Sequence, residues 1–404
     1  MMDKRTEPMT PIITILPGRQ KRLKTGHPWI YSNEIAMTAE ARALPPGSVV
    51  SVKGNDGVFH GLAHFNPHAL ISARIITRRD DAILDAAFFE DRLRRALDLR
   101  SRFFTAPYYR LVHAEADGLP GLIVDRYGDT IVLQFNAAGM DRARADVLAA
   151  VNSVLSPRRC VIRNDSPARE REGLTLGVEI IGETETPGDG TCEIEENGVR
   201  FVTDLQQGQK TGWFFDQREN RRFVASLSNG RRVLDCYCHS GGFGVQAAVS
   251  GAADVTMVDS SALALDMAMQ SAALNNVSAQ CSTIKADVFE ELARRAKAGE
   301  TYDVVIADPP SFVKSKKDQH SGERGYRKLA RLAAALVAPG GMLFIASCSH
   351  NVAPDPFAKL VANGVRDARR TGRILRASGA DVDHPVHPSL PESAYLKALT
   401  LQLD

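Results

Sequence analysis

A regular alternation of strand-like and helix-like segments begins near Val233, and it constrains the fold more than any other feature of the sequence. Apolar runs read VLDCY, VTMVD, STIKAD, DVVIADPP and GMLFIASCS, and helical segments follow them near Gly244, Ala262, Val288 and 325–337. Such alternation is typical of a doubly wound α/β sheet with mostly parallel strands. The sequence therefore predicts an α/β domain in its C-terminal half.

Glycines and acidic residues stand at the ends of these strands, where open α/β sheets bind their ligands. The first strand runs into SGGFG, whose glycines permit a tight turn and close backbone approach before a helix N-terminus. The second ends at Asp259, the third leads to Asp287, and the fourth ends in ADPPSF. Helix caps for the acids and a plain turn for the glycines are the alternatives for single positions. The ordered set favours a cofactor site, and SGGFG lacks the glycine spacing of a nicotinamide fingerprint.

The run from 233 to 312 resembles class I methyltransferases, with a glycine loop, an acid after strand two, an Asp after strand three and DPP after strand four. The resemblance implies S-adenosylmethionine as the cofactor. It implies that Asp259 binds the ribose, that Asp287 and Val288 lie near the adenine, and that the glycine loop lies beside the methionine part.

Further segments narrow the resemblance to one family. GQKTGWFFDQRENRR resembles the TGxFxDQRxNR segment of the ribosomal RNA large-subunit methyltransferase I family, and so do DPPSFVKSK, SCSHNV and HPVHPSLPESAYLK. LPGRQKRLKTGHPWIYSNEI resembles the PUA module of that family, an RNA-binding β-barrel. The resemblance covers nearly the whole chain in the same order. It implies a PUA-like RNA-binding domain at 1–79, a central α+β domain at 80–190 and a methyltransferase domain at 191–404.

The residue patterns of the N-terminal part agree with this division. Residues 10–79 read as short strands between turns, 85–101 as a helix, and 108–135 as three strands joined by turns. A helix over 140–155 and further strands follow. CEIEENGVRFVTD reads as a β-hairpin around Asn-Gly, which opens the C-terminal domain.

The resemblance also assigns a set of residues to the cofactor. They are Thr211, Gly212, Phe214, Asp216, Gln217, Arg218, Asp235, Cys236, Tyr237, Gly241, Gly242, Asp259, Ser260, Asn276, Asp287, Val288, Asp308 and Pro309.

The best-known member of that family makes 5-methylcytosine in large-subunit rRNA, a reaction that needs a thiol. Cytosine C5 is a poor nucleophile, and thiolate attack at C6 makes it enamine-like. Cys348 follows GGMLFIAS at the end of the next strand, where the family's cysteine motif stands, so we predict it to be the nucleophile. A buried core thiol is the alternative. Asp308, held rigidly by Pro309 and Pro310, is predicted to hydrogen-bond the base.

An RNA substrate would need basic and aromatic contacts. The N-terminal module carries more basic than acidic side chains, although the whole chain has a net charge of only +2. A solvated surface for the lysines and core packing for the aromatic residues are the alternatives. The residues predicted to contact RNA are Arg19, Lys21, Arg22, Lys24, Trp29, Phe312, Lys314, Lys316 and Lys317.

Other classes fit the sequence less well. The six cysteines form no C-x-x-C pair, and His60, His64 and His68 stand among residues that break helices, so we expect no metal. No apolar run could span a bilayer and no signal peptide is evident, which predicts a cytoplasmic protein. The predicted partner is large-subunit rRNA, and the resemblance leaves a homodimer open. Two rivals remain: a methyltransferase acting on another position, such as guanine N7, without a cysteine, and a non-catalytic RNA-binding assembly factor.

Overall fold

The computed structural model describes residues 10–183, 190–208 and 211–404, and its contacts divide the chain into two compact units. The first unit contains the described N-terminal residues up to Glu183, together with Thr211 and the later segment Asp383–Ser393. The second unit contains the rest. The contacts thus group the two domains expected at 1–79 and 80–190, and the three-domain division itself stays a prediction.

The first unit begins with a small β-rich module, as the turn-punctuated sequence predicts. Its five strands are ordered β1-β3-β4-β5-β2, with β1 parallel to β3 and the other pairs antiparallel. Apolar residues of these strands form their own core. The elements are β1 Ile12–Thr14, α1 Lys21–Lys24, β2 Trp29–Tyr31, η1 Ser32–Glu34, α2 Ala39–Ala43, β3 Ser48–Lys53, β4 Phe59–Phe65 and β5 Ile71–Thr77.

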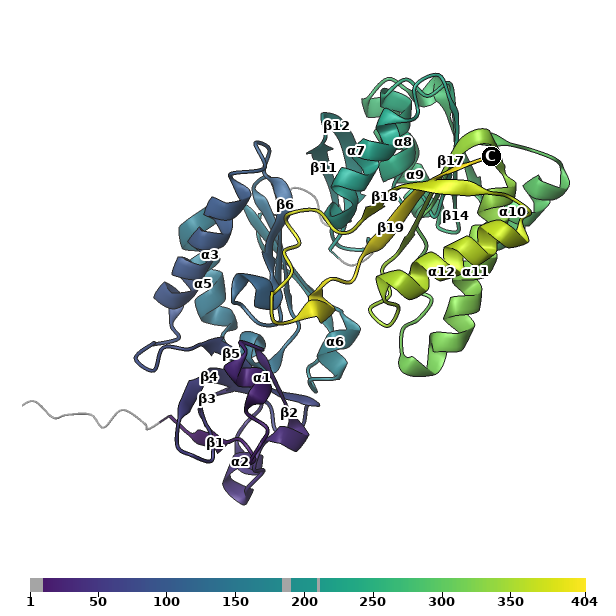
Figure 1. Ribbon diagram of the computed structural model, residues 1–404. Helices are drawn as coiled ribbons and strands as arrows, with labels where there is room; N and C mark the ends of the chain where they lie inside the picture. Colours follow the sequence, from purple (N-terminus) through teal and green to yellow (C-terminus); the bar gives the residue numbers. More distant parts are fainter. Residues whose placement is uncertain (1–9, 184–189, 209–210) are drawn as a thin grey trace, which may run out of the picture. The chain divides into compact units, whose positions relative to one another are not determined.

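The same unit continues with a five-stranded sheet in the order β10-β9-β8-β7-β6. Helices α3 and α5 cover it through a second apolar core (Figure 1). Asp85 caps α3, since its carboxylate accepts the N–H of Phe88 at 3.0 Å. The elements are α3 Ala86–Arg100, β6 Tyr108–His113, η2 Ala114–Asp117, β7 Leu122–Tyr127, β8 Thr130–Phe135, α4 Ala138–Arg142, α5 Arg144–Leu155, β9 Arg159–Asn164, α6 Pro167–Glu170 and β10 Gly177–Gly182.

The second unit contains the predicted doubly wound sheet. Its seven strands are ordered β15-β14-β13-β16-β17-β19-β18; the first five in this order are parallel, and β19 runs antiparallel to both its neighbours. The order reverses next to β13, so the carboxyl ends of β13 and β16 flank the crevice where such folds bind ligands. The strands are β13 Arg232–Cys236, β14 Asp254–Asp259, β15 Cys281–Lys285, β16 Tyr302–Ala307, β17 Val337–Ser347, β18 Gly372–Ser378 and β19 Lys397–Leu403.

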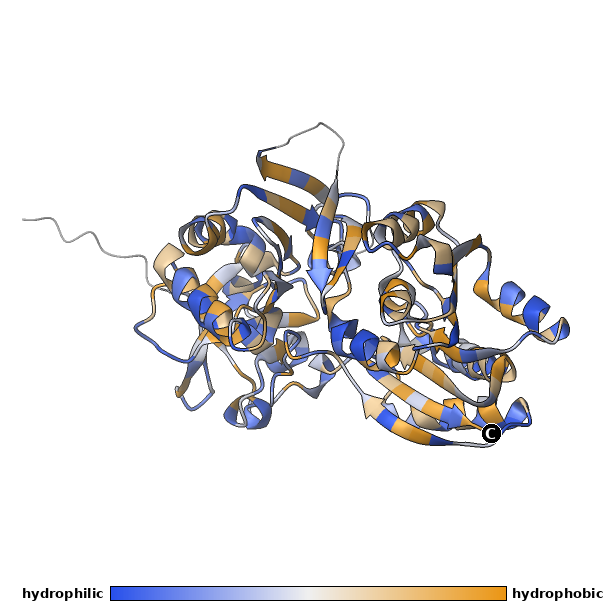
Figure 2. Ribbon diagram, turned by 90° about the horizontal axis from the view of Figure 1, so that it is seen from above, coloured by the Kyte–Doolittle hydropathy of each residue, from blue (hydrophilic) through white to orange (hydrophobic). Residues whose placement is uncertain are grey.

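Helices pack on both faces of this sheet. Helices α10, α11 and α12 share one apolar core with the strands, and α7, α8 and α9 pack in sequence on the other side. Figure 2 shows the orange of the strands between helices whose outer faces are bluer. The helices are η3 Phe215–Gln217, α7 Arg218–Ser226, α8 Gly242–Val249, α9 Ala262–Leu274, η4 Ser278–Gln280, α10 Val288–Lys297, η5 Lys316–Asp318, α11 Gln319–Ala335, α12 Pro354–Asp367 and η6 Pro391–Ser393, of which η6 belongs to the first unit.

A β-hairpin opens the second unit, as predicted. Its strands, β11 Thr191–Glu196 and β12 Val199–Asp204, pair antiparallel across Asn197 and Gly198. Both turn residues have positive φ, 53° and 76°, which suits the tight hairpin turn that Asn-Gly favours. Within the described part of the chain, no helix is long and apolar enough to cross a membrane.

Candidate active site

The loop between β13 and α8 has a constrained backbone. Tyr237 and His239 have φ angles of 61° and 50°, and Gly241 has a φ of 81°. Residues other than glycine rarely adopt this region, so the surroundings must hold the loop in place. A Cβ atom on Gly242 would lie 2.6 Å from Nε of the buried Arg221. The two glycines therefore allow a tight turn at the carboxyl edge of the sheet.

Asp259 at the end of β14 fastens this loop. One of its carboxylate oxygens accepts the N–H of His239 and the other accepts the N–H of Ser261, each at 2.9 Å. Each oxygen keeps a further lone pair, so the carboxylate can also accept hydrogen bonds from ribose hydroxyls. Ser260 lies exposed beside it. The hydrogen-bond acceptors at this strand end thus fit the ribose of the expected cofactor.

Asp235 is buried beneath the loop. Its carboxylate accepts the N–H of Gly244 in α8 at 2.8 Å. Burial raises the pKa of Asp235 to about 8, and the neighbouring charges of Asp308 and Asp259 act in the same direction. These effects indicate that Asp259 at the end of β14 and Asp308 after β16 lie close to Asp235. Pro309, which follows Asp308, is buried.

Asp287 caps a helix, which was the alternative left open by its sequence position. It is the N-cap of α10, and its carboxylate accepts the N–H of Glu290 at 3.1 Å. The side chain of Val288 is buried in the apolar core. Only the exposed edge of Asp287 and the local backbone therefore remain for a cofactor at this strand end.

The segment before α7 contributes one side chain to the loop. The ring of Phe214 lies 5.3 Å from the ring of His239, edge to face. Asp216 instead accepts a hydrogen bond from the hydroxyl of Tyr395 at 2.5 Å. Its neighbours are also engaged within the protein: the amide oxygen of Gln217 accepts from Asn220, and Arg218 forms an ion pair with Asp381 at 3.3 Å. These partners hold the segment in place, so the cofactor contacts predicted for these three side chains remain predictions.

Two residues of the same segment have backbone roles. Thr211 belongs to the first unit, where its carbonyl accepts the hydroxyl of Tyr127 at 3.0 Å. Gly212 has a φ of 113°, and its carbonyl accepts the hydroxyl of Thr203 at 2.6 Å. The left-handed backbone explains the glycine without a ligand.

Two of the predicted cofactor residues lie away from the edge. Cys236 has an exposed fraction of 0% within the apolar core, because side chains alternate along β13 and Cys236 points to the face opposite Asp235. Asn276 follows the end of α9, which runs back from the carboxyl end of β14 towards the start of β15. It therefore lies at the opposite edge of the sheet. These placements do not favour a side-chain contact with the cofactor at either position, and both assignments stay predictions.

Cys348 lies at the end of β17, next to the strand that carries Asp308. Ala307 at the end of β16 pairs with Ile345 near the end of β17, and the two strands are parallel. Asp308 and Cys348 therefore follow neighbouring strands at the same, carboxyl edge of the sheet. Cys348 is partly exposed, whereas Cys160, Cys236, Cys238 and Cys281 are buried. Cys348 is therefore a partly exposed thiol at the carboxyl edge of the sheet, which does not fit the alternative of a core cysteine.

Hydroxyl groups connect the two strand ends. The Ser349 hydroxyl lies 2.8 Å from that of Ser311 and 2.7 Å from that of Tyr326, and it accepts the N–H of Val313 at 3.3 Å. The ring of Phe312 lies 4.8 Å from the ring of Tyr326. These contacts fix the DPPSF loop against Ser349, the residue after Cys348, and they favour packing as the role of Phe312.

Sequence reasoning missed a group of residues from the C-terminal strand. Lys397 begins β19 and is buried, and the ring of Tyr395 lies 5.3 Å from the ring of His350. Their only signal was the SAYLK end of a family-like segment. A lysine at the start of a strand has no pattern of its own, because the pairing of β19 with β17 alone brings it to the site.

The basic N-terminal residues divide into two groups. Arg19, Lys21 and Lys24 are exposed. Arg22 forms an ion pair with Glu34 at 2.7 Å and lies over the ring of Tyr31 at 4.7 Å. Those two contacts hold Arg22 against its own module, so the exposed three are the better candidates for phosphate contact.

The predicted stacking role of Trp29 is not favoured by its contacts. Its indole N–H donates to the carboxylate of Glu115 in η2 at 2.7 Å. This hydrogen bond joins the β-rich module to the neighbouring sheet of the same unit, which makes Trp29 a packing residue.

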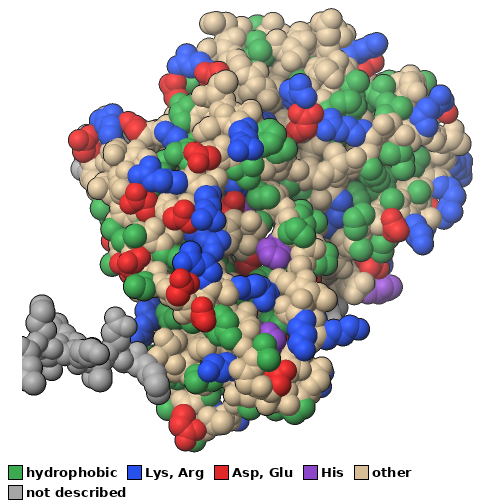
Figure 3. Space-filling model, turned by 60° about the vertical axis from the view of Figure 1, so that its left-hand side comes forward, with side chains coloured by type: hydrophobic (Ala, Val, Ile, Leu, Met, Phe, Trp, Pro, Cys, Tyr) green, Lys and Arg blue, Asp and Glu red, His purple; other side chains and the backbone are tan. Residues whose placement is uncertain are grey.

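On the face seen in Figure 3, lysines and arginines alternate with acidic side chains.

The second lysine cluster follows the DPP loop. Lys314 and Lys317 are exposed, and the side chain of Lys316 lies outside the described residues. No group of three potential metal ligands occurs among the described residues, and His60 and His64 are buried.

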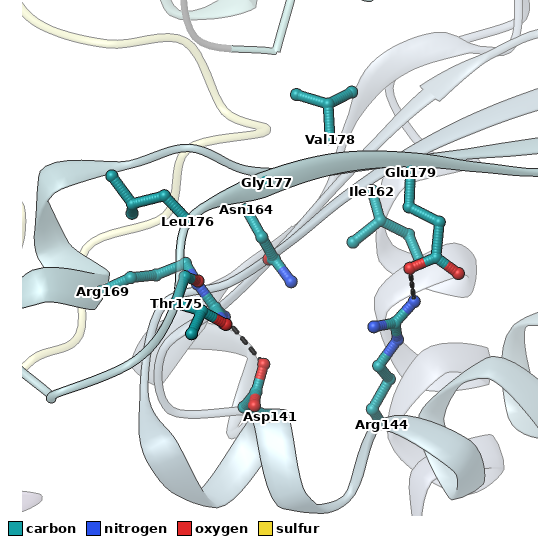
Figure 4. Close-up of a pocket in the computed structure, with 10 residues that line it drawn as sticks. All are labelled: Asp141, Arg144, Ile162, Asn164, Arg169, Thr175, Leu176, Gly177, Val178 and Glu179. Atoms are coloured by element: carbon teal, nitrogen blue, oxygen red, sulfur yellow. Dashed lines mark hydrogen bonds and ion pairs between the residues drawn. The ribbon is translucent and has the colours of Figure 1, made fainter.

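A separate cavity of about 210 Å³ lies in the first unit, away from every predicted site residue. Figure 4 shows two ion pairs across it, Arg169 with Asp141 at 2.8 Å and Arg144 with Glu179. The amide of Asn164 points into it (Figure 4). Its charged groups are already paired with one another, so the cavity offers no catalytic set.

Comparisons with known proteins show which family this chain resembles. Residues 183–402 match the S-adenosylmethionine-dependent methyltransferase family, and residues 13–78 match the PUA-like domain. A ribosomal RNA large subunit methyltransferase I from Pseudoalteromonas atlantica is 36% identical over 97% of this chain and 99% of its own, and one from Aeromonas salmonicida is 37% identical over 98% and 100%.

Solved structures show the same fold. A Streptococcus mutans protein proposed to be a SAM-dependent methyltransferase has a TM-score of 0.81 at 23% identity, covering 97% of this chain and all (100%) of its own. SMU.776, crystallised with SAH, has a TM-score of 0.82 at 22% identity, covering 98% and 100%.

The fold and the strand-end acids thus define an S-adenosylmethionine-dependent methyltransferase that carries a PUA-like domain. Within that class, the extent of the match to the curated relatives decides the family. The chain belongs to the ribosomal RNA large subunit methyltransferase I family.

Proposed function

We propose that the protein methylates C5 of a cytosine in large-subunit rRNA, and that Cys348 is the nucleophile. The observation that carries the proposal is a partly exposed thiol directly after β17, beside the strand that Asp308 follows. The substrate class comes from the names of the relatives, each called a ribosomal RNA large subunit methyltransferase I.

Cys348 and Asp308 have separate roles in this reaction. The Cys348 thiolate forms a bond to C6, and electron density moves to C5. When bound, S-adenosylmethionine would supply the methyl group that bonds to C5, and S-adenosylhomocysteine would leave. A base then takes the proton from C5, the bond between Cys348 and C6 breaks, and the thiolate is restored. Asp308 hydrogen-bonds the N3 and N4 edge of the base and stabilises the charge that develops there.

The substrate base must leave its stack to reach the thiol. Enzymes that act on a base either flip it out or act on unpaired RNA. The hydrogen bonds of Ser349 hold the DPPSF loop beside Cys348, where an unpaired base would enter. The exposed Lys314 and Lys317 follow directly and suit contact with the flanking phosphates.

The covalent step is tested by trapping. Incubation with rRNA that contains 5-azacytidine should give a stable protein–RNA adduct, because the substituted base has no C5 proton to lose. Cys348→Ser should abolish the adduct, and Cys192→Ser, which alters another partly exposed cysteine, should not.

A turnover assay separates the rival chemistries. Full methyl transfer by Cys348→Ala would overturn the cysteine mechanism and favour a base position that needs no thiol, such as guanine N7. Calorimetry that detects no S-adenosylmethionine binding would favour a non-catalytic assembly factor instead.

A further inference from the structure

Lys397 is a buried lysine next to the residues that flank Cys348. It is 7% exposed, and the antiparallel register of β17 and β19 pairs it with Ser347. Its ammonium group donates to the carbonyl oxygen of Ser349 and, at 2.9 Å, to that of Tyr395. The amine therefore links Ser349, which follows Cys348, to Tyr395, which precedes β19.

The charge of this lysine has no acidic partner in the parts of the chain that the structure describes. Both hydrogen-bond acceptors are neutral carbonyls. An ammonium group is costly to bury unless an anion lies near it. Burial lowers the pKa of Lys397 to about 8, and Cys348 acts in the opposite direction, as a nearby thiolate would. A thiolate on Cys348 would therefore supply the negative charge that the buried ammonium group lacks.

We propose that Lys397 is a positioning residue that stabilises the thiolate of Cys348. The S–H bond of Cys348 breaks and its proton passes to solvent water, while Lys397 stays protonated and its ammonium charge stabilises the thiolate that forms. The ammonium group then holds the thiolate ready to attack. This inference rests on the proposed function, since it gives the nucleophile of that reaction its reactive form.

Other titratable groups around this pair come from neighbouring elements. Tyr326 on α11 is electrostatically coupled to Cys348, and burial raises the pKa of its hydroxyl. His350 follows β17, Tyr395 precedes β19, and Asp308 follows β16. Among these groups, Lys397 is the one lysine or arginine. It is therefore the residue to change.

The rate of Cys348 alkylation by iodoacetamide measures the proposed effect directly. Parent protein, Lys397→Gln and Lys397→Arg are treated over a range of pH, and each cysteine peptide is quantified by mass spectrometry. Lys397→Gln keeps a donor and removes the charge, so we expect Cys348 to react about tenfold more slowly at pH 7, with its pH midpoint at least about one unit higher. Lys397→Arg should keep the midpoint of the parent.

Internal controls keep the result interpretable. Cys192, also partly exposed, should react equally in all three proteins, and calorimetry with S-adenosylmethionine reports folding. An unchanged rate and midpoint in Lys397→Gln would overturn the inference, and so would an equal loss in both variants. The alkylation uses neither RNA nor methyl transfer, so a Cys348→Ala variant with full turnover would refute the proposed function as a separate result.

Discussion

At the scale of single residues, the carboxyl groups at the carboxyl edge of the sheet have different roles because their surroundings differ. Asp259 is partly exposed and accepts two backbone N–H groups, whereas Asp235 is buried and accepts one. Asp287 caps a helix. The sequence could predict an acid at each strand end, since strand periodicity places it. It could not predict which acid keeps an exposed edge for a ligand, because burial depends on distant packing.

Asp259→Ala should weaken S-adenosylmethionine binding at least about tenfold. The change removes both the acceptors for the ribose and the two hydrogen bonds that hold the glycine loop. Isothermal calorimetry gives the dissociation constant. Asp254→Ala is the matched control, because Asp254 begins the same strand at the opposite edge. Equal affinities of the Asp259→Ala variant and the parent would contradict the assignment.

Asp235→Asn should change the pH dependence of stability. The pKa of Asp235 is raised from 3.8 to about 8 in the folded protein. Between these values the folded protein holds a proton that the unfolded chain has released, so this group lowers the free energy of unfolding as the pH rises. Asparagine still accepts from Gly244 and does not titrate. We expect the variant to melt on the order of 5 °C above the parent near pH 8 and to converge with it near pH 4. Parallel melting curves across this window would be the contrary result.

At the scale of elements, the sequence predicted what local patterns encode. Strand–helix alternation gave the parallel part of the sheet, and Asn197-Gly198 gave the hairpin of β11 and β12. It did not give β18, α12 or the antiparallel insertion of β19. The pairing of Lys397 with Ser347 joins residues far apart in sequence. No local periodicity reports such a contact, which is why the lysine of the site was missed.

The hairpin is joined to α7 by a buried ion pair. Glu196 on β11 accepts from Arg221 at 2.7 Å and from the indole N–H of Trp213 at 2.9 Å. Glu196→Gln removes the charge that compensates Arg221, so we expect the free energy of unfolding of the second unit to fall by about 3 kcal/mol. Denaturant unfolding measures it. Glu195→Gln changes the exposed neighbour and should have an effect within about 0.5 kcal/mol. Equal stability of the two variants would show that the pair contributes little.

At the scale of the whole molecule, the two units carry different parts of the proposed activity. The methyltransferase fold and its strand-end acids belong to the second unit, and the exposed basic residues near α1 belong to the first. Because the segment Asp383–Ser393 returns to the first unit between β18 and β19, the chain enters β19 from a part of the protein that packs elsewhere. A truncation of the N-terminal part would leave this segment without the rest of its unit, so surface substitutions are the cleaner test of RNA binding.

Replacing Arg19, Lys21 and Lys24 together by glutamine should weaken RNA binding and flatten its dependence on salt. All three are exposed, and each phosphate contact with single-stranded RNA adds about 0.7 to the slope of log affinity against log salt. If all three contact phosphates, the slope should fall by roughly 2, while S-adenosylmethionine affinity stays unchanged. Filter binding to an rRNA fragment between low and physiological salt measures the RNA affinity and its salt slope. Calorimetry measures the S-adenosylmethionine affinity.

The matched control removes charge elsewhere on the same unit. Arg94→Gln with Arg95→Gln alters two arginines of α3 that are already paired with Glu90 and Asp91. Their phosphate contacts would have to compete with those ion pairs, so this variant should keep the slope of the parent. A slope reduced equally in both variants would mean that charge anywhere on the first unit attracts RNA and that the segment near α1 is no dedicated binding surface.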